Sequence, residues 1–230
     1  MGIVTGGIPR RITLELASLH GCRVFVETGT FQGETTRWAS EHFEVVHTIE
    51  RAETLYRRHR KELAALGGVT PHQGDSREIL PRIVAELGNR RAVHWLDGHW
   101  SGGETAGVQD ECPLLDELAC LSGRSEDIIL IDDARLFLGA PPSPHDPRQW
   151  PTILEVLEAL PRSAGAPFVQ VVDDVIFAVP DEEPLRRHLV DYTQTRATAA
   201  LAEQHVSLAR GSWFKTRLKR VLSRVRGSGP

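Results

Sequence analysis

The sequence lacks the features that mark membrane-spanning and secreted proteins. No apolar run approaches the roughly 18 residues that a helix needs to cross a bilayer, and Met1–Arg10 has no apolar stretch of the signal-peptide kind. The three cysteines, Cys22, Cys112 and Cys120, form no C-x-x-C pair, and their odd number argues against a disulfide framework. We therefore expect a reduced, cytoplasmic protein.

Acidic side chains are missing from the end of the chain. None follows Glu203, whereas the same stretch carries seven arginines and lysines. The rest of the chain has 20 basic and 31 acidic residues, a net charge of −11. Because an acidic body repels polyanions, we expect no nucleic-acid partner. Lysine is scarce too, at Lys61, Lys215 and Lys219 only, so the many arginines are typical of GC-rich codon usage rather than of RNA binding.

What is present predicts one α/β domain over residues 1–209. The 230 residues, 40% of them hydrophobic and 25% charged, suit a globular protein with a sizeable core. Strand-like apolar runs lie at Val24–Glu27, Val45–Ile49, Val69–His72, Ala92–Asp97, Asp127–Ile131, Phe168–Val172 and Val175–Val179. Helical patterns lie at Arg10–His20, Thr35–Phe43, Ala52–Leu66, Arg77–Leu87, Cys112–Leu121 and Thr152–Leu160.

The order of these elements predicts the kind of sheet. Strands that alternate with helices imply a mostly parallel sheet with helices on both faces. Only Asp173 and Asp174 join the last two strands, which is too short for a crossover helix, so we expect an antiparallel C-terminal hairpin. The Pro-rich segment Gly139–Pro151 is the one long irregular loop inside the domain, and we expect it to form a lid.

The most informative motif lies at the end of the first strand. Residues 24–36 read V-F-V-E-T-G-T-F-Q-G-E-T-T, an apolar run, an acid and two glycines before a helical segment. Glycine lets the backbone approach a ligand closely, and the first amides of a helix can donate hydrogen bonds to it. The G-x-G-x-x-G pattern of dinucleotide-binding dehydrogenases is absent. The acid-x-G-x-x-x-G spacing instead resembles the first motif of class I S-adenosylmethionine (SAM)-dependent methyltransferases.

This resemblance implies a Rossmann-like methyltransferase sheet and SAM as the cofactor. The implied cofactor-binding residues lie in the turn and at the next strand ends: Glu27, Thr28, Gly29, Gly33, Thr35, Glu50, Asp75, Ser76 and Asp97. Glu50 matches the acid that holds the ribose hydroxyls in the family, and Asp75 matches the position that meets the adenine amino group. The alternative is that Asp75 or Ser76 only caps the next helix.

Three aspartates follow two neighbouring strands. Asp97 lies in Leu-Asp-Gly, and Asp132 and Asp133 lie in Ile-Asp-Asp, so the strand ends bring them into one volume. Clustered carboxylates repel one another unless a cation neutralises them, and Mg²⁺ or Ca²⁺ prefers such oxygen ligands. The two motifs are similar to those of metal-dependent sugar O-methyltransferases of macrolide tailoring, which implies a Mg²⁺ site at these three residues. The alternative is a set of exposed turn acids.

A general base is expected beside these acids. His99 follows Asp97 in a glycine-flanked turn, His145 lies in the Pro-rich segment, and Asp97 is a third candidate. The polar insertion Ser101–Pro113 is expected to form a wall of the acceptor-binding site. Within it, Asp110 or Glu111 is expected to cap the following helix.

The chemistry implied is methylation of a hydroxyl of a saccharide, a polysaccharide end or a glycosylated natural product. The Asn/Asp-Pro-Pro-Tyr motif of amino-methylating nucleic-acid enzymes is absent. Trp100 and Trp150 offer apolar faces for sugar rings, whereas Trp95 is expected in the core. Three alternatives remain: a phenolic or catechol acceptor, a metal-dependent hydrolase without SAM, and a non-catalytic adaptor.

The basic tail, residues 210–230, has helical periodicity. An apolar stripe runs between its arginines and lysines, which is typical of a helix at an anionic membrane surface. The alternative is a helix packed on its own domain or on a second subunit. A homodimer is expected by analogy only.

Overall fold

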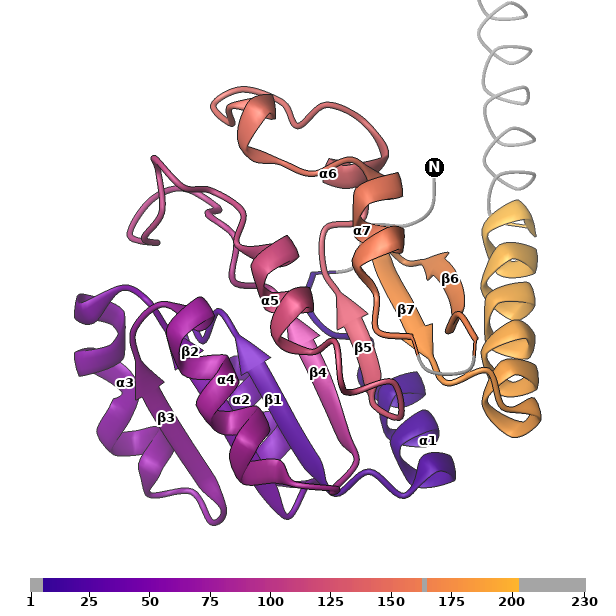
Figure 1. The fold of residues 1–230 in the computed structure, drawn as a ribbon, viewed down its shortest axis with the longest axis horizontal. Coiled ribbons are helices and arrows are strands. Elements are labelled where there is room, and N and C mark those ends of the chain that lie inside the picture. The colour runs from indigo at the N-terminus through magenta and orange to yellow at the C-terminus, as the bar shows by residue number, and fades with distance from the viewer. Residues whose placement is uncertain (1–5, 163–164, 203–230) are drawn as a thin grey trace, which may run out of the picture.

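Seven strands form one sheet in the computed structural model, which describes residues 6–162 and 165–202. The order is β3-β2-β1-β4-β5-β7-β6, in which β1 to β5 are parallel and β7 is antiparallel to both β5 and β6 (Figure 1). The bounds are β1 (Val24–Thr28), β2 (Val45–Glu50), β3 (Val69–Gln73), β4 (Ala92–Leu96), β5 (Ile128–Ile131), β6 (Phe168–Val172) and β7 (Val175–Val179). The seven predicted strands and the antiparallel hairpin are confirmed.

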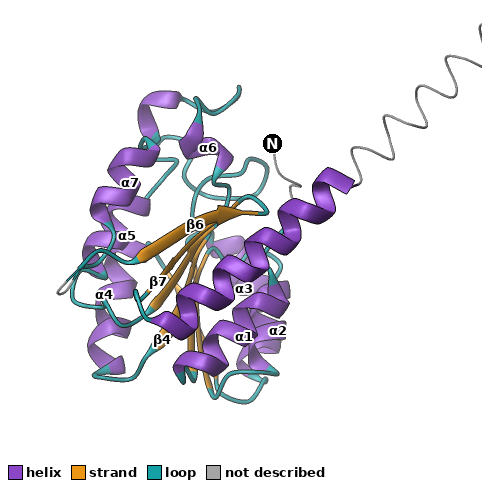
Figure 2. Ribbon diagram, turned by 90° about the vertical axis from the view of Figure 1, so that its right-hand side faces the viewer, coloured by secondary structure: helices purple, strands orange, loops and turns teal. Residues whose placement is uncertain are grey.

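Helices cover both faces of the sheet. Figure 2 shows α4, α5 and α7 on one side and α1, α2 and α3 on the other. The bounds are α1 (Arg10–His20), α2 (Glu34–Ser40), α3 (Glu53–Ala64), α4 (Ser76–Leu87), α5 (Leu114–Cys120), α6 (Arg135–Leu138) and α7 (Ile153–Ala159), with a 3₁₀ turn, η1, at Pro147–Gln149. Residues 183–202 are also helical. The sequence did not predict α6, η1 or this last helix.

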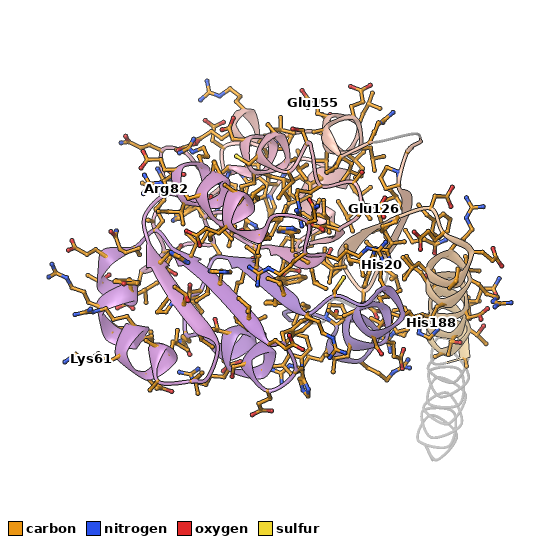
Figure 3. The ribbon with its side chains drawn as sticks, turned by 60° about the horizontal axis from the view of Figure 1, so that its bottom comes forward. His20, Lys61, Arg82, Glu126, Glu155 and His188 are labelled. Carbon is orange, nitrogen blue, oxygen red and sulfur yellow. The ribbon has the colours of Figure 1, made fainter. Side chains whose placement is uncertain are left out.

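The core has two halves because strand side chains alternate between the faces. In β5, Ile128 and Leu130 pack with α1, α2 and the helix at 183–202, whereas Ile129 and Ile131 pack with α4, α5 and α7. Trp95 of β4 is fully buried in the first half, as predicted. The α1 helix is tied to the rest of the molecule at its C-terminal end and at its middle. His20 Nε2 lies 2.8 Å from the carbonyl oxygen of Glu126, and His188 Nε2 lies 3.0 Å from Glu15 Oε2 (His20, Glu126 and His188 are labelled in Figure 3).

The hairpin turn between β6 and β7 supports the segment that follows the C-terminal end of β5. Asp173 and Asp174 both have positive φ, 53° and 67°, as a two-residue turn of right-handed twist requires. The carbonyl of Asp174 accepts from Ala134 N at 2.8 Å, and its carboxylate accepts from Arg135 N at 2.9 Å. The turn therefore fixes the residues that follow β5, where two of the predicted site residues lie.

In the part of the chain that the structure describes, no helix is long and apolar enough to cross a membrane. The basic tail at 210–230 lies outside the described residues.

Candidate functional site

The turn after β1 brings backbone against backbone. Gly29 has φ +83°, and a Cβ at this position would lie 2.1 Å from the carbonyl oxygen of Asp97. Gly33, at φ +75°, begins α2 and faces Leu63 of α3, where a Cβ would lie 3.0 Å from a methyl carbon. Both conformations are ones that a side chain disfavours. The two glycines of the motif therefore serve the tight turn that was predicted.

Glu27 lies behind this turn rather than in the pocket. Its side chain is fully enclosed, and its Oε2 accepts hydrogen bonds from Thr36 Oγ1 at 2.5 Å and Thr48 Oγ1 at 2.6 Å. Burial raises the pKa of Glu27 to about 7, and the two hydroxyls act in the opposite direction. Thr36 makes this contact, whereas its neighbour Thr35 is the residue that was predicted to bind the cofactor.

A pocket opens at the carboxyl ends of the parallel strands. Several predicted cofactor residues share its lining: Gly29, Glu50, Asp75, Ser76 and Asp97, with His99. Glu27, Thr28, Gly33 and Thr35 do not line it. Thr28 is buried beneath the pocket, where its hydroxyl accepts from Asp97 N at 3.2 Å.

Glu50, at the end of β2, is held in place by backbone donors. Its Oε2 accepts from Phe31 N at 2.8 Å and its Oε1 from Ala52 N at 2.7 Å. Burial raises the pKa of Glu50, and these donors partly offset the effect. Each carboxylate oxygen keeps a further lone pair that can face a ligand in the pocket.

Asp75 caps a helix, as the alternative interpretation proposed. It begins α4 and accepts from Arg77 N at 3.0 Å, and the Arg77 guanidinium donates to its carboxylate at 2.7 Å. The Arg77 side chain holds the pKa of Asp75 below its usual range. Asp75 and Ser76 nevertheless both line the pocket, so capping and ligand contact are compatible.

The segment after β4, residues 98–113, crosses the mouth of the pocket, and we call it the strap. Figure 1 shows it above the arrowheads of the parallel strands. Asp110 in the strap pairs with Arg51 at 3.1 Å and with Arg77. The pocket beneath has a volume of about 120 Å³, below the roughly 300 Å³ or more of typical small-molecule sites. In this conformation the pocket therefore does not enclose a whole nucleoside.

His99 and the three predicted aspartates do come together. His99 Nε2 lies 2.7 Å from Asp133 Oδ2 and 3.7 Å from Asp97 Oδ1. Asp133, whose φ is +56°, also accepts from Arg135 at 2.6 Å, and Asp132 Oδ1 accepts from Asp133 N at 2.8 Å.

The charges of this cluster act on one another. Burial raises the pKa of Asp97 well above its ordinary range, and the carboxylates of Asp132 and Asp133 raise it further. Burial and the neighbouring Asp133 raise the pKa of Asp132 to about 6. Although burial lowers the pKa of His99, its hydrogen bond to Asp133 and the charge of Asp97 outweigh this and raise it. Burial would raise the pKa of Asp133, but its bonds to His99 and Arg135 lower it.

The predicted magnesium site is not assembled in this arrangement. Within residues 6–162 and 165–202, no three His, Cys, Asp or Glu side chains are placed to hold a metal ion. The donor set gives the physical reason. Both oxygens of Asp133 already face cationic or imidazole partners, His99 and Arg135, and Asp132 is bound by backbone. In this arrangement the charge of Asp133 is therefore already balanced by Arg135 and His99.

His145 contacts the strap rather than the pocket. Its Nδ1 lies 2.9 Å from Glu111 Oε2, and its ring packs edge-on against Trp100 and Trp150. Asp110 and Glu111 do not cap α5, which begins after Pro113, so that expectation is wrong. Both carboxylates are used instead to hold segments together.

The sequence analysis did not single out two residues that line the pocket, Phe31 and Arg51. Thr105 and Ala106 line it too, and they belong to the insertion Ser101–Pro113 that was expected to form a wall of the acceptor site. Phe31 adopts positive φ, 48°, between the two glycines of the motif, so its place in the turn was the available signal. Arg51 follows the predicted Glu50 and was not distinguished from the many other arginines.

No protein-family model matches the sequence, and no curated protein matches it. Among solved structures, a putative caffeoyl-CoA O-methyltransferase from Staphylococcus aureus is similar with a TM-score of 0.53 and 13% identity, over 77% of this chain and 85% of that one. The O-methyltransferase TomG from Streptomyces achromogenes, involved in tomaymycin synthesis and solved with SAM, has a TM-score of 0.49 and 18% identity, over 76% of this chain and 82% of that one. The likeness to the S. aureus structure and the strand order agree: the chain has the Rossmann-like fold of class I methyltransferases, mostly parallel with antiparallel C-terminal strands.

Proposed function

We propose that the protein is a SAM-dependent O-methyltransferase. One observation carries the proposal: a single pocket at the carboxyl ends of the parallel strands is lined by Gly29, Glu50 and His99. Ligands of open parallel sheets bind at this edge. A close backbone turn and a buried carboxylate suit a sulfonium nucleoside there, and an imidazole suits a hydroxyl acceptor.

Glu50 and the turn serve the cofactor. The carboxylate of Glu50 is preoriented by Phe31 N and Ala52 N, and it accepts hydrogen bonds from the two ribose hydroxyls. The absence of a side chain at Gly29 lets the turn pack against the backbone of Asp97, and this close packing shapes the wall of the pocket on which the ligand lies. Ser76, at the start of α4, contributes a hydroxyl on the adenine side.

His99 serves the acceptor. Methyl transfer forms a carbon–oxygen bond to the acceptor, breaks the carbon–sulfur bond of SAM and leaves S-adenosylhomocysteine (SAH), while the hydroxyl proton moves to a base. Asp133 accepts from Nε2–H of His99, and this fixes the tautomer in which Nδ1 is basic. Nδ1 then takes the proton, and Asp133 stabilises the imidazolium that forms. The main acceleration comes from aligning donor and acceptor.

For the acceptor we propose a neutral hydroxyl compound of the saccharide class. Two observations support it: the net charge of −11 before the tail, which disfavours polyanions, and the partly exposed ring of Trp100, directly after His99 in the strap. Trp150, also expected to offer a face to sugar rings, is instead buried and packs against His99 and Phe137. A phenolic acceptor is the second candidate, favoured by the same Trp100 ring. Magnesium dependence remains a prediction from the sequence, tested by calorimetric titration with Mg²⁺ and by activity in EDTA.

Calorimetric titration with SAH tests the proposal. We expect binding to the wild type, a loss of at least about tenfold in affinity for Glu50→Ala, and unchanged affinity for Glu53→Gln, a control on exposed α3 surface. Methyl transfer from SAM to a panel of sugars and phenols then identifies the acceptor by mass spectrometry. A wild type that does not bind SAH would overturn the proposal and leave the hydrolase or the adaptor. Binding without transfer to any hydroxyl acceptor would contradict the O-methyltransferase assignment.

A further inference from the structure

Glu111, the acid near the end of the strap, has no task in the proposed chemistry. Only 2% of the residue is exposed to solvent, yet its carboxylate is ionised, because hydrogen bonds lower the pKa of Glu111 against the effect of burial. A buried charge is costly unless it is well bonded. The contacts of this carboxylate therefore need an explanation.

Three donors converge on the carboxylate, and all come from the segment 139–151. Trp150 Nε1 donates to Oε2 at 2.7 Å, His145 Nδ1 lies 2.9 Å from Oε2, and Asp146 N donates to Oε1 at 3.0 Å. The backbone N of Glu111 donates in return to Gln149 Oε1 at 3.0 Å. Both oxygens of the carboxylate are therefore occupied by groups of this one segment. Glu111 thus joins the strap to the segment predicted as a lid.

One ring contact leads from this junction to the candidate base. The indole of Trp150 lies 5.3 Å from the ring of His99, centroid to centroid, and 5.7 Å from the ring of Phe137. On the other side of Glu111, its carbonyl accepts from Trp100 N at 2.7 Å, directly after His99 in the chain. Glu111 therefore contacts two neighbours of His99: its carboxylate binds Trp150, a neighbour in space, and its backbone carbonyl binds Trp100, the neighbour in sequence.

We propose that Glu111 is a positioning residue: by holding the Trp150 indole against the His99 ring, it keeps His99 Nε2 directed at Asp133. The inference rests on the proposed function, in which His99 is the base. It gives the segment 139–151 a defined role as the support of the site, and it assigns His145 to that support rather than to proton transfer.

Two variants test the proposal in the full chain. Glu111→Gln keeps the size of the side chain but places an amide NH₂ among N–H donors, and Trp150→Phe removes the indole donor while it keeps an aromatic ring. For both we expect kcat to fall by at least about tenfold, because small displacements of a reacting group are costly. The Kd for SAH should change less than about threefold, because neither residue lines the cofactor pocket. Glu158→Gln, the same chemical change on exposed α7 surface, is the matched control and should leave both values unchanged.

A second readout does not depend on activity. In ¹⁵N NMR spectra of the histidine rings, wild-type His99 should show a protected Nε2–H bonded to Asp133, and both variants should lose it. Equal kcat in wild type and variants, or a change in KM alone, would overturn the positioning role. So would an intact His99 signal in a variant whose 139–151 amides exchange faster. If the wild type transfers no methyl group but the variants still lose the His99 signal, the proposed function fails and the structural coupling stands.

Discussion

His99 Nε2 lies 2.7 Å from Asp133 Oδ2, although the two residues are 34 positions apart in the chain. The contact exists because β4 and β5 are parallel neighbours, so the residues that follow both strands emerge at the same edge. Asp133 reaches the ring from a left-handed backbone conformation, with φ +56°, and such strain in a non-glycine residue is typical of functional sites.

His99→Gln is the first prediction. We expect kcat to fall by about 10²- to 10⁴-fold, the usual contribution of a general base, with the affinity for SAH nearly unchanged. In Asp133→Asn the fall in kcat should be smaller. The acidic limb of its pH–rate profile should move to lower pH, because the carboxylate raises the pKa of His99 and the base must be neutral to act. Initial rates measured between pH 5 and 9 check both. His188→Gln, on the distant helix at 183–202, is the control; full activity of His99→Gln would contradict the role of the base.

The parts of the fold that the sequence predicted are those governed by local periodicity. The central strands β1, β4, β5 and β7 are buried along their whole length and are mostly apolar, because helices cover both faces of the sheet there. The edge strand β3, V-T-P-H-Q, buries only Val69. The α6 helix has only four residues, too few for a period to be visible. In the helix at 183–202, only Leu185 and Leu189 are buried apolar side chains, so its apolar stripe is weak.

The site was predictable only as far as topology decides it. Strand-end acids must gather at one edge, which placed Asp97, Asp132 and Asp133 together without any knowledge of side chains. Their partners do not follow from the strand order. Arg135, two residues on, and His99, from the segment after β4, bind different oxygens of Asp133. Glu111 contacts the segment 139–151 instead of the helix that it was expected to cap.

The ion pairs of Asp110 are expected to control release of the cofactor. Asp110→Asn removes the charge that ties the strap to Arg51 and Arg77, so the strap opens more often. Because the Asp110 side chain is partly exposed, each of the two pairs is worth at most about 1 kcal/mol, and the loss of both corresponds to a rise of up to about thirtyfold in the SAH dissociation rate. Stopped-flow measurement checks this.

Two comparisons sharpen the Asp110 experiment. Asp181→Asn breaks another exposed ion pair, with Arg186, far from the pocket and should leave the rate unchanged. High salt should raise the wild-type rate toward that of Asp110→Asn, since salt screens exposed pairs. An equal dissociation rate in wild type and Asp110→Asn at low salt would show that these pairs do not hold the strap.

Glu27 is expected to make stability depend on pH. Its pKa is about 7 in the fold, against an ordinary value of 4.5, so the fold favours the protonated carboxyl. Its contribution to stability is full below about pH 4.5 and is lost as the pH rises to about 7. Glu27→Gln should therefore gain stability relative to the wild type between these values, by roughly 3 kcal/mol at most. Urea unfolding of both proteins at pH 4.5 and pH 8 checks this. If the free energies of unfolding of variant and wild type differed by the same amount at both pH values, the prediction would be refuted.

Gly29→Ala is expected to damage both the fold and the pocket. The added Cβ would lie 2.1 Å from the carbonyl oxygen of Asp97 and 2.8 Å from its carbonyl carbon, and φ +83° adds strain of about 1 to 2 kcal/mol for an L residue. Relief requires the ends of β1 and β4 to separate, which breaks the hydrogen bond from Asp97 N to the Thr28 carbonyl. We expect a loss of about 3 kcal/mol or more in the free energy of unfolding and no measurable SAH binding.

Gly123→Ala is the matched control for this change, because an added Cβ there meets no atom within 4 Å. It should alter the free energy of unfolding by less than about 1 kcal/mol and leave SAH affinity intact. Urea unfolding and calorimetry on the two variants separate the causes. If Gly29→Ala were as stable as Gly123→Ala and still bound SAH, the chain would have accommodated a side chain at the point where the two backbones meet. The close approach of the turn to Asp97 would then not be what builds the pocket.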